Sequence, residues 1–105
     1  MEIIINKREI YITKANTFFK KLVGLIGKKN IKVGLFFPKT RSIHTFFMKE
    51  NIDIIMINKE NIVVYFYKNL SKNKIIIKKE AYHTIELPCN TIDNIKIGDK
   101  LIIKD

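Results

Sequence analysis

Three side chains in apolar stretches of this sequence carry groups suited to acid–base chemistry. His44 is one of two histidines, Asp53 precedes a run of isoleucines, and Glu86 stands between Ile85 and Leu87. Imidazoles and carboxylates are the usual general acids and bases, and they also bind ligands. These three residues would form an enzyme site only if they converged on one pocket.

Each of these residues also has a structural explanation. One histidine without a nearby acid is weak evidence for a site, so a partly buried side chain that donates to a backbone carbonyl is the favoured interpretation of His44. Asp53 must reach water or accept hydrogen bonds, and stabilising the turn at residues 49–51 is one such role. Strand alternation turns Glu86 away from its two neighbours, with solvent as one environment. Lys49 joins these three as a candidate ligand-binding residue.

Familiar motifs for metal, phosphate or nucleophilic chemistry are missing from the sequence. No Cys and His residues stand at zinc spacing, the four glycines are not clustered, and no Gly-x-Ser-x-Gly occurs. Cys89 is the single cysteine, which excludes an internal disulfide, and the sequence shows no group beside it that would activate the thiol. We therefore expect neither a metal nor a cofactor.

Length and composition predict one small folded domain over residues 1–105. The chain has 105 residues, of which 47% are apolar, enough for a single core. No stretch approaches the roughly 18 apolar residues that span a bilayer, and no export leader is recognisable. We expect a cytoplasmic protein without a membrane span.

The formal charge of +10 admits two interpretations. A nucleic-acid or anionic-membrane binder would carry such a charge. Compositional drift towards Lys, Ile and Asn would produce it too, and drift is favoured because the lysines are scattered and only Arg8 and Arg41 could read phosphates or guanine bidentately. Nucleic acid is therefore the less favoured partner, behind a small-molecule or protein ligand.

The hydrophobic pattern predicts mostly strands. Apolar residues recur at helical period only from Phe18 to Ile26, which predicts a helix at about residues 16–26. Residues 68–73 are expected to form a loop and residues 90–95 a helical turn. Strands are predicted at residues 3–5, 10–12, 32–37, 44–48, 52–57, 62–67, 74–78, 83–87 and 100–103. The resulting fold class is mainly β (α+β): a strongly curved, mostly antiparallel sheet or open barrel of about seven or eight strands with one packed helix.

The strands at residues 52–57 and 62–67 have apolar side chains on both faces, so both are predicted to be central. Residues 44–48 and 52–57 are expected to pair as a hairpin across a three-residue loop, which puts His44 and Asp53 on opposite faces. A four-residue loop would instead put them on the same face. Phe46 and Phe47 are expected to pack in the core.

The central motif resembles that of the DUF192 (UPF0127) family. It reads Ser42-Ile43-His44-Thr45-Phe46-Phe47-Met48, followed by Ile52-Asp53-Ile54-Ile55. Gly24-Leu25-Ile26, Gly34-Leu35-Phe36-Phe37, Ile85-Glu86-Leu87-Pro88 and Ile97-Gly98-Asp99 resemble further family motifs in the same order. Cys89-Asn90 and Thr40-Arg41 depart from the family pattern. The resemblance implies a predominantly β fold and no particular activity.

Three functions follow as hypotheses. A complete fold without a recognisable catalytic set favours a non-enzymatic binding or accessory module. The alternatives are a small enzyme that uses Asp53, Glu86 and His44, and non-specific nucleic-acid binding through the basic surface.

Overall fold

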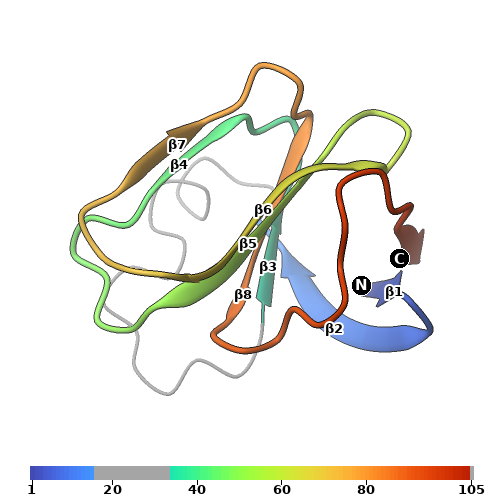
Figure 1. The fold of residues 1–105 in the computed structure, drawn as a ribbon, viewed down its shortest axis with the longest axis horizontal. Coiled ribbons are helices and arrows are strands. Elements are labelled where there is room, and N and C mark those ends of the chain that lie inside the picture. The colour runs from blue at the N-terminus through green and yellow to red at the C-terminus, as the bar shows by residue number, and fades with distance from the viewer. Residues whose placement is uncertain (16–33, 105) are drawn as a thin grey trace.

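Nine β-strands form the part of the chain that the computed structural model describes, residues 1–15 and 34–104. They are β1 (Glu2–Ile5), β2 (Arg8–Lys14), β3 (Gly34–Phe37), β4 (Ser42–His44), β5 (Ile52–Ile57), β6 (Val63–Leu70), β7 (Ile75–Ile77), β8 (His83–Pro88) and β9 (Ile102–Lys104). Seven strands form a curled sheet in the order β6-β5-β8-β3-β2-β1-β9, while β4 and β7 form a separate ribbon (Figure 1). The prediction of a mainly β fold is confirmed.

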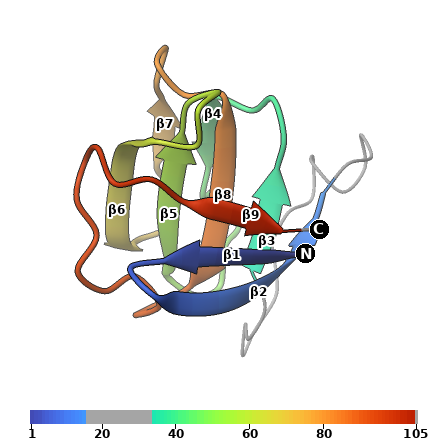
Figure 2. The ribbon, with the colours of Figure 1, turned by 90° about the vertical axis from the view of Figure 1, so that its right-hand side faces the viewer.

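The seven-stranded sheet curls until its two edges meet at one end (Figure 2). β6 and β9 are the edge strands, and the segment before β9 bonds to the start of β6. The N–H of Val63 donates to the carbonyl of Asp99 at 2.8 Å, and its carbonyl accepts the N–H of Gly98 at 2.8 Å. These bonds make the sheet a half-barrel, because they join its edges over part of their length. All strand pairs are antiparallel except β2 with β3.

β1 and β2 form a hairpin with a two-residue turn, whereas the strands predicted at residues 3–5 and 10–12 left four residues between them. Ile5 pairs with Arg8, so only Asn6 and Lys7 lie between β1 and β2. Their φ angles are 49° and 70°, as in a type I′ turn, whose twist matches that of the flanking strands.

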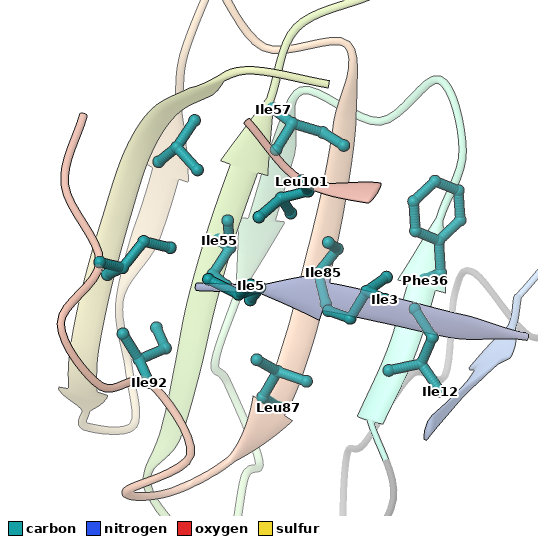
Figure 3. Close-up of a cluster of buried hydrophobic side chains, with 12 residues drawn as sticks. Ile3, Ile5, Ile12, Phe36, Ile55, Ile57, Ile85, Leu87, Ile92 and Leu101 are labelled. Atoms are coloured by element: carbon teal, nitrogen blue, oxygen red, sulfur yellow. The ribbon is translucent and has the colours of Figure 1, made fainter. Parts of the chain in front are cut away.

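β5 separates two hydrophobic clusters and is buried on both faces, as its sequence predicted. Ile52, Ile54 and Met56 contribute to the cluster beneath the β4–β7 ribbon. Ile55 and Ile57 point the other way. Figure 3 shows them with side chains of β1 and β8 in the cluster inside the half-barrel, whose buried members are Ile3, Ile5, Ile12, Phe36, Ile55, Ile57, Val63, Ile85, Leu87, Ile92, Ile95 and Leu101. β6, predicted to be central, lies instead at the sheet edge.

At Gly34, β3 lies very close to both of its neighbours. A Cβ atom there would lie 2.6 Å from Cδ2 of Leu87, 2.8 Å from the carbonyl oxygen of Glu86 and 3.0 Å from Cγ2 of Ile12. Because one of these atoms belongs to the backbone of β8, a side chain at this position would force the strands apart.

The predicted hairpin between residues 44–48 and 52–57 is wrong in both of its registers. β4 ends at His44 and pairs with β7, whereas β5 pairs with β6 and β8. Residues 45–51 therefore connect two sheets. The local pattern could not reveal this, because the bonds that turn the chain away from β5 come from residues 71–74.

Two further predictions are wrong, and a third falls on residues that the structure does not describe. β6 continues through residues 68–70, where a loop was expected, and residues 90–95 form no helical turn. The helix predicted at residues 16–26 lies outside the described residues. In the described ranges no helix is long and apolar enough to cross a membrane.

Candidate functional site

Asp53 is fully buried and accepts three backbone hydrogen bonds. Its Oδ1 accepts the N–H of Asn69 at 2.8 Å, and its Oδ2 accepts those of Thr91 at 2.8 Å and Ile92 at 2.9 Å. Of the two expected environments, water or hydrogen-bond donors, the structure shows the second, and the donors belong to β6 and the segment after β8 rather than to the 49–51 turn. The carboxylate fastens these two segments to β5.

A β-bulge explains the bond between Asp53 and β6. Ile52 pairs with Leu70 but Ile54 pairs with Tyr67, so two residues of β6 oppose Asp53. One of them, Asn69, has a φ of 58°, and its N–H turns to the carboxylate. A bulge leaves its extra residue outside the ladder, and Asp53 supplies the missing acceptor.

Glu86 is buried in β8, where solvent was one expected environment. It lies opposite Ile54 on one side and Leu35 on the other, which places it on the sheet face of the β4–β7 ribbon. Asp53 lies opposite Leu87, a member of the half-barrel cluster. Cross-strand partners share a face, so Asp53 and Glu86 lie on opposite faces of the sheet.

His44 is exposed on the outer face of β4, so the partly buried environment favoured for it is wrong. Its neighbour Ile43 points inward to the cluster shared with β5, which directs His44 away from that sheet. The imidazole instead lies against Phe46, with ring centroids 5.4 Å apart, and opposite Ile75 of β7. The structure thus does not gather His44, Asp53 and Glu86 on a common face.

Hydrogen bonds of Thr45 fix the course of the chain directly after β4. Its hydroxyl is buried, donates to the carbonyl of Ser71 at 2.8 Å and accepts the N–H of Lys74 at 2.9 Å. Its own N–H donates to the carbonyl of Lys74 at 2.9 Å. Its carbonyl accepts the N–H groups of Met48 and Asn73, each at 3.2 Å. Thr45 therefore ties the 45–48 turn to the 71–74 loop through both its side chain and its backbone.

Phe47 projects from this turn with 80% of its surface exposed. Its φ is 65°, a left-handed conformation that costs a residue with a Cβ roughly 1–2 kcal/mol. The sequence predicted a core residue here, and the structure buries Met48 instead. The turn is thus built to hold an aromatic ring outward.

The ribbon itself exposes two more large apolar side chains. Ile75 and Ile77 of β7 are 62% and 67% exposed, whereas Ile76 between them is buried. We call Phe46, Phe47, His44, Ile75 and Ile77 the outer surface. Figure 1 shows the β4–β7 ribbon on the side of the molecule away from both termini.

Basic residues surround the outer surface at both ends of the ribbon. Arg41 adjoins β4 and lies beside Lys78, whose N–H donates to the Arg41 carbonyl at 3.0 Å. At the other end Lys74 adjoins Thr45. The exposed cations of these segments are Arg41, Lys49, Lys72, Lys74 and Lys79, against the acidic residues Glu50 and Glu80. His44 and Lys49 are therefore the two predicted residues that the structure places in this region.

Phe47, Ile75, Ile77 and Thr45 were not predicted as site residues. An apolar residue in a strand pattern is normally evidence for burial, so exposure of Phe47 or Ile75 carries no local signal. The adjacent lysines of residues 72–74 and 78–79 were the available indication that β7 lies at the surface.

His83, the second histidine, lies at the opposite end of β8 from Asp53. Its Nδ1 accepts the N–H of Lys39 at 3.1 Å, and its ring packs against Phe36 at 4.9 Å between centroids. Burial lowers the pKa of His83 below its ordinary value, and the positive charges of Lys14 and Lys39 lower that pKa further. The neutral imidazole is the form that this environment favours.

Sequence comparison matches residues 1–103 to the family DUF192, described as an uncharacterized ACR. A UPF0127 protein of Thermococcus sibiricus is 36% identical over 95 residues, covering 83% of this chain and 62% of that protein. A UPF0127 protein of Thermococcus kodakarensis is 37% identical over 92 residues, covering 81% of this chain and 58% of that protein. The chain thus spans about three fifths of the length of these relatives.

Two crystal structures resemble this one in fold. A Sinorhizobium meliloti protein, named for a proposed role in transcription regulation, matches with a TM-score of 0.81 at 17% identity, over 96% of this chain and 89% of that one. A Novosphingobium aromaticivorans protein of unknown function matches with a TM-score of 0.77 at 16% identity, over 97% of this chain and 82% of that one. At such identities the likeness shows a common fold alone.

Proposed function

Because the chain belongs to the DUF192 (UPF0127) family, whose description assigns no activity, we propose that it is a small, non-enzymatic binding module. The binding site in this proposal is the outer surface, with His44 and Lys49 among its contacts. The observation that carries the proposal is Phe47, held 80% exposed in a left-handed conformation by a turn that Thr45 fastens. Backbone strain of this kind is concentrated at binding and switching sites.

The surroundings of the outer surface indicate the chemistry of its partner. Exposed Phe47, Ile75 and Ile77 offer apolar contact, and exposed cations stand at both ends of the ribbon. A complementary partner has negative charge next to apolar groups. Asp53 and Glu86 are not needed as ligand contacts in this proposal, and the hydrogen bonds of Asp53 give it a structural role.

The two alternative functions draw less support from the geometry. An enzyme that uses His44, Asp53 and Glu86 needs these groups to converge, and they lie on different faces. Nucleic-acid binding draws on the charge of +10 and remains an outcome of the test below. The cytoplasmic location, the single-domain organisation and the helix at residues 16–26 stay predictions.

The test is an NMR titration of the isotopically labelled chain with three anionic probes: phospholipid bicelles containing phosphatidylglycerol, a peptide of alternating Glu and Leu, and oligothymidylate. We expect amide shifts in residues 41–49 and 72–79 with at least one probe, and their loss in Phe47→Ser. The proposal fails if no probe shifts these amides. It also fails if the protein turns over a member of a small-molecule panel and His44→Ala abolishes that turnover.

A further inference from the structure

We propose that the partner of the outer surface is an anionic lipid bilayer, which the protein contacts peripherally. This inference rests on the proposed function and names its ligand. Three features of the ribbon carry it: protruding apolar side chains, a turn with hydrogen-bonded backbone groups at its base, and cations placed around the apolar residues.

The protruding side chains are those that enter the interface between lipid headgroups and acyl chains most favourably. Phe47 at the turn is 80% exposed, and Ile75 and Ile77 on the ribbon are 62% and 67% exposed. Peripheral binding strengthens with the apolar area that leaves water and with attraction to anionic lipids. These three side chains can lose contact with water without any rearrangement of the ribbon.

The turn that carries Phe47 has internal partners for the backbone groups at its base. The N–H of Thr45 donates to Lys74, the carbonyl of Thr45 accepts from Met48, and the Thr45 hydroxyl bonds to the 71–74 loop. A backbone polar group without a partner is costly to bring into an apolar environment. The Thr45 bonds remove that cost for the groups at the base of the turn.

The cations stand where headgroup phosphates would lie if the outer surface faced a bilayer. Arg41 and Lys79 are exposed at one end of the ribbon, and Lys72 and Lys74 are exposed at the other. Each Lys or Arg near an anionic leaflet adds attraction that decays within a Debye length. Long side chains of this kind keep their charge in the headgroup layer while their methylenes cover apolar surface.

Two other anionic partners fit the outer surface less well. Single-stranded nucleic acid stacks its bases on flat rings, which the outer surface has in Phe47, but the exposed Ile75 and Ile77 add branched aliphatic groups on which bases do not stack. A peptide that adds a strand needs a long open edge, whereas β4 and β7 have 3 residues each. A bilayer requires neither rings nor an edge.

A single tryptophan tests insertion directly, because the chain contains none. Phe47→Trp places the reporter at the turn. Tyr11→Trp is its control, since Tyr11 is also exposed, at 72%, but lies on β2 away from the ribbon. With vesicles of equal parts phosphatidylglycerol and phosphatidylcholine, we expect the emission of Phe47→Trp to shift to shorter wavelength and that of Tyr11→Trp to stay unchanged. Vesicles of phosphatidylcholine alone should produce a much smaller shift.

Vesicle co-sedimentation of the other variants measures each contribution. Phe47→Ser is expected to lower the partition coefficient by about 10- to 100-fold, the equivalent of burying one Phe side chain, whereas Tyr11→Ser should not change it. Lys74→Gln is expected to lower it by about fivefold and Lys100→Gln, on the far side of the sheet, by much less. Binding of the wild-type protein should fall as sodium chloride is raised.

The inference is overturned if Phe47→Ser sediments with these vesicles as well as the wild type, or if Phe47→Trp and Tyr11→Trp respond alike. It is also overturned if the Glu/Leu peptide or oligothymidylate shifts the amides of the outer surface while the vesicles bind nothing. That last result would be compatible with the proposed function. If no probe shifts the amides of the outer surface, both the proposed function and the lipid partner are refuted.

Discussion

Asp53→Ala would leave three backbone N–H groups of Asn69, Thr91 and Ile92 without their acceptor. The Ile92 N–H is buried and the other two are partly buried, so water can replace the lost oxygen only in part. Hydrogen bonds to a charged group contribute about 1.5–3 kcal/mol each, and three that share one carboxylate are not additive, so we expect a loss of about 4 kcal/mol. For a domain of this size, about 4 kcal/mol lowers the melting temperature by roughly 15–30 °C.

Asp53→Asn distinguishes the loss of hydrogen-bond acceptors from the loss of side-chain volume, because asparagine has nearly the volume of aspartate. The amide keeps one oxygen but turns an NH2 group towards a backbone N–H, so we expect an intermediate loss of about 2 kcal/mol. Urea denaturation followed by circular dichroism measures both variants, and hydrogen exchange should accelerate first at the Thr91 and Ile92 amides. Asp93→Ala is the matched control, because Asp93 is an exposed carboxylate in the same segment and should change stability by less than about 0.5 kcal/mol.

A structural role for Asp53 is refuted if Asp53→Ala unfolds at the same urea concentration as the wild type. If Asp53→Asn keeps full stability but loses binding of a ligand, Asp53 is a ligand contact rather than a structural residue.

Three further perturbations test other parts of the fold. Gly34→Ala should lower the free energy of unfolding by about 1–3 kcal/mol, since the new Cβ meets the β8 backbone; an unchanged urea midpoint would contradict the close approach. Phe47→Asn should change stability by less than about 1 kcal/mol, because relief of the left-handed conformation offsets the small contact area lost; a loss of about 3–5 kcal/mol, typical of a core Phe, would refute its exposure. The lowered pKa of His83 means that the unfolded chain binds more protons below about pH 6.5, so stability present above that pH is lost as the pH falls towards the folded-state pKa. His83→Asn, which keeps an acceptor for Lys39, should lack this loss when urea midpoints are compared across pH, and equal pH dependence in both proteins would count against it.

Strand positions were largely predictable because period-2 patterns and runs of Ile are local properties. The burial of β5 on both faces followed from the consecutive apolar side chains of residues 54–57. Partner choice was not predictable, because the departure of the chain after His44 depends on bonds between Thr45 and the distant 71–74 loop. Strand alternation correctly put the Glu86 side chain on the face opposite Ile85 and Leu87. It could not predict that the β4–β7 ribbon lies on that face, because the position of the ribbon is a tertiary feature.

The candidate site was predictable only in its polar members. His44 and Lys49 stood out by their chemistry. His44 belongs to the outer surface, and Lys49 is exposed in the segment that follows β4. Phe47 and Ile75 could not be identified, because an exposed and a buried apolar residue look alike in a short strand pattern. The positive φ of Phe47 could not be predicted from the residue type, because bulky residues rarely adopt positive φ angles.

The pairing of β1 with β9 has a consequence for how the chain acquires its fold. Ile3 pairs with Ile103, so β1 gains this neighbour only after nearly all of the described residues have been made. Until then β1 exposes one row of backbone donors and acceptors to other nascent chains, a known hazard of unpaired strands. Contacts between residues so far apart in sequence also slow folding, because loop closure precedes the gain from pairing. Folding of these strands should therefore take milliseconds to seconds rather than microseconds.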